Sequence, residues 1–137
     1  MRKDLIIGVI ALYVLWSVMD IIIHGVLLTP IYEATASIWR PMEEMKMGVI
    51  YLTTLIAAIC FTLIFALGIA GGGMSKALQF GVYFGIGAGV SMGLGTYSVL
   101  PIPLSLAMGW LLGTLAEAVL GALLLHWVFG RFGAKSA

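Results

Sequence analysis

Residues 47–70 read MGVIYLTTLIAAICFTLIFALGIA and contain no charged side chain. A helix needs about 20 mostly apolar residues to cross the hydrocarbon layer of a bilayer, and this run is long enough to do so. Three further segments are also long and mostly apolar. The sequence therefore predicts an all-α integral membrane protein that forms a four-transmembrane-helix bundle. The predicted spans are residues 5–28, 47–70, 77–100 and 104–129, in a single membrane domain that runs through residues 1–137.

The composition of the whole chain agrees with that class. Of its 137 residues, 62% are hydrophobic and 9% are charged, and the mean hydropathy is +1.14. A soluble domain carries about 25% charged residues, so this chain cannot cover a surface that faces water. The net charge of +1 provides no basic field for nucleic acid. The single cysteine, Cys60, excludes a disulfide framework within one chain.

No motif of an enzyme or of a tightly bound cofactor is visible. Residues 71–73 are three glycines, but they lack the following Gly-Lys-Ser/Thr of a phosphate-binding loop and they come after a helix. No serine, cysteine or aspartate stands in a nucleophile motif. We therefore expect neither enzymatic activity nor a cofactor.

The basic residues are divided unevenly between the two sides of the predicted bundle. Cytoplasmic segments of membrane proteins carry an excess of Lys and Arg. Five basic residues fall on the side of the termini and two on the other side, so both termini are expected to be cytoplasmic. The five are Arg2, Lys3, Lys76, Arg131 and Lys135, and the two are Arg40 and Lys46.

The first span could be mistaken for a signal peptide, because residues 34–36 resemble a cleavage site. Its apolar run is longer than the 7–15 residues of a signal-peptide core. It also contains Asp20. We therefore expect the segment to be retained as a span.

The connection at residues 29–46 is the only predicted loop that is long enough to hold a further feature. Pro30 is expected to end the first helix at Thr29, because a residue before proline avoids the α conformation. Residues 32–40 can form a short helix that lies in the headgroup region. Pro41, followed by two glutamates, resembles the start of the next helix.

Glycines recur every four residues in the last two spans. Small residues at this spacing let helix backbones approach closely in lipid, so we expect these spans to form a tight hairpin across the short turn at residues 101–103. The alternative is that the flat glycine face borders a path for a substrate. The glycines are Gly81, Gly85, Gly89 and Gly93 in the third span, and Gly109, Gly113 and Gly121 in the fourth.

Ionisable side chains inside a membrane are costly and are candidates for function. Asp20 and His24 are four residues apart, so they share one face of the first span, and Tyr13 and Ser17 extend that face. A stripe of this polarity must face the bundle, a cavity or a partner. The pair is either a structural hydrogen bond, a proton or cation site that opens to the outer side, or part of a metal site.

Glu117 lies near the centre of the fourth span, at a depth close to that of Asp20. Two carboxyls that meet in a low-dielectric core cannot both stay ionised without a partner. One of them would keep its proton near pH 7, or a cation would sit between them. The alternative is a protonated Glu117 that only bonds a neighbouring helix. His126 is nine residues further on, beside Trp127, and is expected at the membrane interface.

Metal binding is a weaker prediction. Thioether sulfur selects Cu(I), and Met42 and Met45 lie on the same side as His24, but methionines are also ordinary packing residues. A haem held by two histidines of one chain is excluded, because His24 and His126 are expected near opposite membrane surfaces.

Three short segments carry a family resemblance: residues 24–28 (HGVLL), 30–32 (PIY) and 39–42 (WRPM). Together with the spans that follow, they resemble the small bacterial four-span membrane proteins of the DUF1761-type group. The resemblance covers about the first 50 residues and implies a location in a bacterial inner membrane. It implies no activity.

The sequence leaves open several hypotheses about function. The first is a small transport-type protein, acting as an oligomer, that handles protons or a cation through Asp20, His24 and Glu117. The second is a non-catalytic accessory subunit of a larger membrane complex, and the third is a copper-handling protein. The expected partners are the lipid bilayer and either further copies of the chain or a membrane complex, and no nucleic acid is expected.

Overall fold

Four long helices make up the computed structural model, which describes residues 3–133. They are α1 (Lys3–Ile22), α3 (Met47–Gly68), α4 (Gly73–Tyr97) and α5 (Leu104–Phe132). The described residues include no strand. Each of these helices is long and apolar enough to cross a membrane. The first candidate span includes the continuation of α1 to Leu27, and the third begins at Ala70, just before α4. The predicted all-α, four-span architecture is confirmed at this level.

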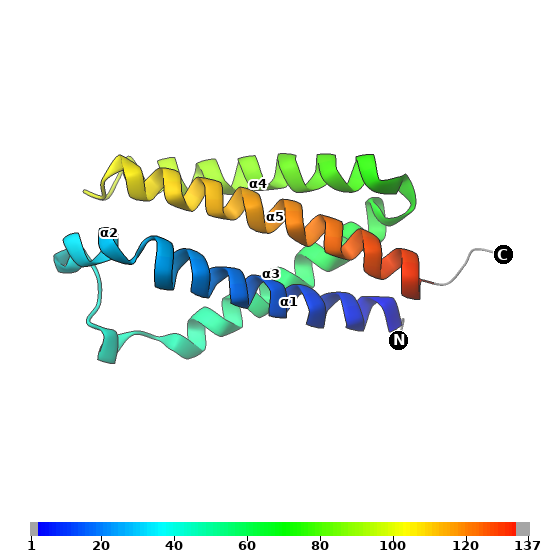
Figure 1. Ribbon diagram of the computed structural model, residues 1–137, viewed down its shortest axis with the longest axis horizontal. Coiled ribbons are helices and arrows are strands. Elements are labelled where there is room, and N and C mark those ends of the chain that lie inside the picture. Colours follow the sequence, from blue (N-terminus) through cyan, green and yellow to red (C-terminus); the bar gives the residue numbers. More distant parts are fainter. Residues whose placement is uncertain (1–2, 134–137) are drawn as a thin grey trace.

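α4, α5 and α1 run roughly side by side, and α3 crosses α1 diagonally (Figure 1). α5 is central, because it packs against α4 along its length and also against α1, and α1 in turn packs against α3. α1 begins and α5 ends at the end of the bundle where α3 connects to α4, and we call this the terminal end. The opposite end carries α2 (Thr29–Ala34) and the α4–α5 turn, and we call it the α2 end.

Contact between α4 and α5 depends on the α4 glycines. A Cβ atom placed on Gly81 would lie 2.8 Å from the Cα of Val119, and one on Gly89 would lie 2.8 Å from the carbonyl oxygen of Leu111. Gly85 and Gly93 also face α5 backbone. The two backbones are therefore closer than side chains at these positions would permit.

The α5 glycines do not face α4, and the expectation that both glycine stripes meet in one hairpin is corrected here. A Cβ on Gly109 would meet Leu28, one on Gly113 would meet Ile23, and one on Gly121 would meet Leu12 and Trp16. These side chains belong to α1 and its continuation. The small residues of α5 thus accommodate large side chains of α1, while its opposite face carries the α4 contact.

The first span ends before Thr29, as expected from Pro30, but its last turn is not α-helical. After α1 the chain continues as a π-helix, Ile23–Leu27, which ends where the amide of Leu28 donates to the carbonyl of Ile23. Pro30 then stands in the first turn of α2, where its missing N–H costs nothing. The proline therefore stands at the start of a separate short helix, α2, which follows the bend at Leu28.

The expected short helix over residues 32–40 is broken. α2 ends at Ala34, and a single 3-10 turn, Ala36–Ile38, follows. The hydroxyl of Thr35 donates to the carbonyl of Ile31 at 2.7 Å and accepts the indole N–H of Trp39 at 2.9 Å. Such side-chain bonds compete with continuation of a helix.

Two other boundaries differ from the sequence predictions. The second span begins at Met47, as predicted, whereas the helix start expected at Pro41 is only a 3-10 turn, Met42–Glu44. The third span begins at Gly73, earlier than the predicted Ala77, so that Lys76 lies inside α4. Gly73 has a φ of 75°, which glycine adopts without the strain of a side chain, and this lets α4 start directly after the turn.

Candidate functional site

The carboxyls of Asp20 on α1 and Glu117 on α5 line one cavity and are close enough to interact electrostatically. The Oε1 atom of Glu117 is shielded from solvent and has no hydrogen-bond donor among the described residues. Only a proton or a cation can turn the contact of these acceptor-only groups into a favourable one. At a separation of about 4 Å, two unit charges repel by about 4 kcal/mol at an effective dielectric constant of about 20.

Trp16 fixes the two helices at this level. Its indole N–H donates to the backbone carbonyl of Glu117 at 2.8 Å. Because Trp16 precedes Asp20 by four residues, both side chains lie on the same face of α1. The bond therefore sets the height of Asp20 relative to Glu117.

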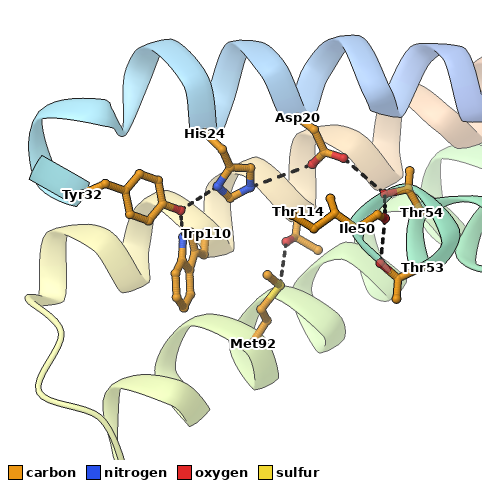
Figure 2. Close-up of polar contacts among 9 residues, drawn as sticks. All are labelled: Asp20, His24, Tyr32, Ile50, Thr53, Thr54, Met92, Trp110 and Thr114. Carbon is orange, nitrogen blue, oxygen red and sulfur yellow. Dashed lines mark hydrogen bonds and ion pairs between the residues drawn. The ribbon is translucent and has the colours of Figure 1, made fainter. Parts of the chain in front are cut away.

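A series of polar contacts leads from Asp20 to the α2 end (Figure 2). Nε2 of His24 lies 3.9 Å from Oδ1 of Asp20, and Nδ1 of His24 lies 2.7 Å from the hydroxyl of Tyr32. The same hydroxyl accepts the indole N–H of Trp110 at 2.7 Å. The series thus connects α1, its π-helical continuation, α2 and α5.

These contacts select the tautomer of a neutral His24. An indole N–H can only donate, so the Tyr32 oxygen accepts from Trp110 and is free to give its own proton to Nδ1 of His24. The hydrogen of the neutral imidazole is then on Nε2, which faces Asp20. His24 therefore has an acceptor toward Tyr32 and a donor toward the carboxyl.

Tyr32 lies outside the spanning segments and is kept as a donor by its surroundings. Burial raises the pKa of its phenol above the usual value of 10.0. The bond from Trp110 opposes this rise in the pKa, and the charge of Asp20 adds to it. The phenol thus holds its proton at neutral pH.

A cavity of about 270 Å³ adjoins the carboxyl pair. Its walls combine the two carboxyls with the hydroxyls of Thr54 and Thr114, the rings of Trp16 and Phe84, and the sulfur of Met92. Among the described residues that line it there is no lysine, arginine or histidine. The cavity is therefore acidic on one side and apolar or weakly polar elsewhere.

The threonine hydroxyls near the cavity already have acceptors. Thr54 donates to the carbonyl of Ile50 at 3.1 Å and lies 3.5 Å from Oδ2 of Asp20, so the single hydroxyl proton favours Ile50. Thr114 is directed at the sulfur of Met92, 4.0 Å away across the space between α5 and α4 (Figure 2). Neither hydroxyl neutralises the carboxyl pair.

Phenylalanines close the cavity toward the terminal end. Phe61, 1% exposed, has its ring centroid 5.1 Å from that of Trp16 and 5.0 Å from that of Phe84. Phe80 and Phe65 continue this aromatic packing. The carboxyl pair therefore has polar neighbours toward the α2 end and packed rings toward the terminal end.

The structure separates the candidate residues of the first span. It brings Asp20, His24 and Glu117 together, but not Tyr13, which packs against the apolar core, or Ser17, whose buried hydroxyl has no partner among the described residues. The face of α1 that lines the cavity carries Asp20 and, four residues earlier, Trp16. His126 lies on α5 nine residues beyond Glu117 and takes no part in the cavity.

Four residues of this site were not predicted from the sequence: Trp16, Tyr32, Trp110 and Thr54. Trp16 had a signal, since it is one turn from Asp20. The pairing of Tyr32 with Trp110 had none, because the two residues are separated by 78 positions.

The copper hypothesis gains no geometric support. Met42, 74% exposed, and Met45 lie in the connection before α3, and the ring of His24 is engaged by Asp20 and Tyr32. Residues 3–133 contain no group of three or more His, Cys, Asp and Glu side chains that could hold a metal ion.

No family model, no curated protein and no solved structure matches the chain. The resemblance to the DUF1761-type group stays a prediction. Any function must therefore be argued from the geometry of the site itself.

Proposed function

We propose that the protein is a small transport-type membrane protein that binds and releases protons, or exchanges a proton for a cation, at the Asp20–Glu117 pair. The observation that carries the proposal is the adjacency of the two carboxyls beside a cavity whose described lining has no basic residue. A pair of this kind requires a positive partner, and a proton or a soluble cation can supply it.

His24 gives the pair a route for protons from the α2 end. It presents one ring nitrogen to Tyr32 and the other to Asp20. It can therefore accept a proton on Nδ1 and release one from Nε2 toward the carboxyl, the two-sided exchange for which histidine is suited. About a third of its side chain is exposed, 36%, so the ring is not sealed inside the bundle.

The direction of the carboxyls favours transport over a role as an accessory subunit. An accessory subunit can turn its polar stripe outward to a partner, whereas a transporter needs that stripe to face its own cavity. Asp20 and Glu117 face a cavity lined by α1, α3, α4 and α5 of the same chain.

The orientation in the membrane is part of the proposal. We propose that both termini lie in the cytoplasm and the α2 end faces outward, because five of the seven Lys and Arg residues fall on the side of the termini. The resemblance to the DUF1761-type group supports a bacterial inner membrane as the location. The aromatic rings of Tyr32 and Trp39 at that end suit the headgroup region, so residues 29–46 are proposed to lie at the interface. Reporter fusions after Arg40 and at the C-terminus test this, and a periplasm-active reporter at Ala137 contradicts it.

Assembly is also part of the proposal. α3 packs against α1 and diverges from α4 toward the α2 end (Figure 1), so its outer half is exposed, with Tyr51 at 51% and Leu52 at 53%. We propose that another copy of the chain covers this face in the membrane. Native mass spectrometry in mild detergent measures the number of copies.

Proton flux into reconstituted vesicles tests the proposed activity. Asp20→Asn and Glu117→Gln keep hydrogen-bonding groups of the same size and remove the titrating carboxyls. Both variants are expected to fold and to lose flux, and Glu43→Gln, in the exposed connection, is the matched control that keeps it. Unchanged flux in both folded carboxyl variants rejects the proposal.

A further inference from the structure

The cavity beside the carboxyl pair has a size that a proton does not require. A water molecule occupies about 30 Å³ in the liquid, and a protein cavity of about 150 Å³ holds a benzene molecule. At about 270 Å³, this cavity can admit an organic molecule larger than benzene. Its volume thus bears on which cation the site receives.

The walls of the cavity distinguish an organic cation from a bare metal ion. A hard cation such as Ca²⁺ takes six to eight oxygen ligands, but here the hydroxyls of Thr54 and Thr114 are directed to other acceptors. Among the described residues, His24 is the neighbour of Asp20, yet no group of three or more His, Cys, Asp and Glu side chains could hold a metal ion. The carboxyl oxygens are thus the principal charged ligands.

The remaining walls suit the apolar part of an organic cation. The rings of Trp16 and Phe84 line the cavity together with the thioether of Met92. Aromatic faces attract ammonium groups electrostatically and also offer apolar contact. One side of the cavity therefore supplies negative charge, and the other supplies rings and sulfur.

Access to the cavity is from the side of the bundle. Its α3 and α4 walls are formed by exposed residues, among them Thr53 and Ala57 on α3 and Met92 on α4. α3 and α4 diverge toward the α2 end (Figure 1). A molecule that partitions into the outer part of a bilayer can enter between them without passing the packed ring of Phe61.

We propose that this cavity is a binding site for a small organic ammonium ion, with the charged nitrogen at the Asp20–Glu117 pair and its apolar part against Trp16, Phe84 and Met92. The inference rests on the proposed function of the same carboxyls and names the class of cation that they take. A pair that holds one shared proton carries one negative charge, which matches a monovalent ammonium ion.

Calorimetric titration of the purified protein in mild detergent with benzyltrimethylammonium chloride tests the proposal. This probe cannot lose a proton, and it carries an aromatic ring. Saturable binding of one probe per site is expected, with no comparable heat from sodium chloride or from uncharged benzyl alcohol. Equal binding of benzyl alcohol overturns the charge requirement.

Two variants separate charge from space. Glu117→Gln is expected to weaken probe binding by about tenfold or more, as removal of a desolvated charge partner does. Ala57→Phe fills the cavity while leaving both carboxyls in place, and it should weaken binding as well. Ala116→Phe, on α5 but lining a different, apolar cavity of about 340 Å³, is the control that should bind normally. If Glu117→Gln does not fold, Asp20→Asn and Ala57→Phe carry the test.

The outcomes distinguish this inference from the proposed function. The ammonium site is overturned, and the proton function is kept, if proton flux depends on Glu117 but the probe does not bind at millimolar concentration. The same conclusion follows if the probe binds and Ala57→Phe leaves that binding unchanged. Flux that is indifferent to both carboxyls overturns the proposed function. Probe binding that is lost in Glu117→Gln and in Ala57→Phe, and kept in Ala116→Phe, supports the site.

Discussion

Replacing Gly89 by alanine is expected to destabilise the α4–α5 contact. The added Cβ would lie 2.8 Å from the carbonyl oxygen of Leu111, which is 0.6 Å short of the 3.4 Å at which ordinary contact begins. A backbone oxygen in the middle of a helix cannot rotate away, so α4 must shift as a body. That shift also loosens the contacts of Gly85 and Gly93 with α5.

The magnitude of this effect can be isolated with a neighbouring glycine. Overpacking a close contact costs about 1–3 kcal/mol, while alanine gains up to about 1 kcal/mol over glycine inside a helix. Gly87 lies one half-turn away in α4, and a Cβ there would meet nothing within 4 Å. Gly87→Ala therefore receives the propensity gain alone, and the difference between the two variants is the packing cost of about 1–3 kcal/mol.

The assay is the free energy of unfolding of both variants in detergent micelles, measured by titration with a denaturing detergent. Gly89→Ala should be the less stable variant, and Gly87→Ala should equal or exceed the unsubstituted protein. If the two variants have the same stability, the glycine face of α4 does not lie against α5 and the packing described here is wrong.

Three further outcomes are expected. Tyr32→Phe leaves the Trp110 indole N–H and Nδ1 of His24 without their shared partner, which should cost about 1–3 kcal/mol, and nitrogen NMR should show the His24 tautomers becoming mixed. The pKa of the Tyr32 phenol is raised in the folded state, so the stabilisation by the protonated phenol is complete below pH 10.0 and is lost as the pH rises through the folded pKa. Ultraviolet absorbance should follow this titration. A phenol that ionises below pH 10.0 contradicts the prediction. Gly73→Ala should destabilise the protein by about 1–3 kcal/mol, because Gly73 has φ 75° and ψ −178°, a conformation essentially restricted to glycine. Gly71→Ala, where φ is not positive and no atom lies within 4 Å, should not change the thermal unfolding temperature.

The class of the protein could be predicted from the sequence because membrane insertion is close to a local property. The transfer of apolar side chains into lipid adds up along the chain, so the four long runs predict four spans independently of one another. The same argument identified Asp20 and Glu117 as side chains that must avoid lipid. Helix ends were less certain, because capping and turn geometry shift them: α4 starts at Gly73 through a positive φ and not at the first purely apolar residue.

What lies beside each helix face was decided by the tertiary structure alone. Spacing shows that Gly109, Gly113 and Gly121 share a face of α5, but not that this face meets α1 and not α4. In a soluble helix the polar side reveals which side is buried, whereas in a membrane helix both sides are apolar and this signal is lost. The bond between Tyr32 and Trp110 depends on residues that are distant in sequence, which no local pattern in the chain encodes. The same is true of the divergence of α3 from α4, which leaves a cavity beside the carboxyl pair.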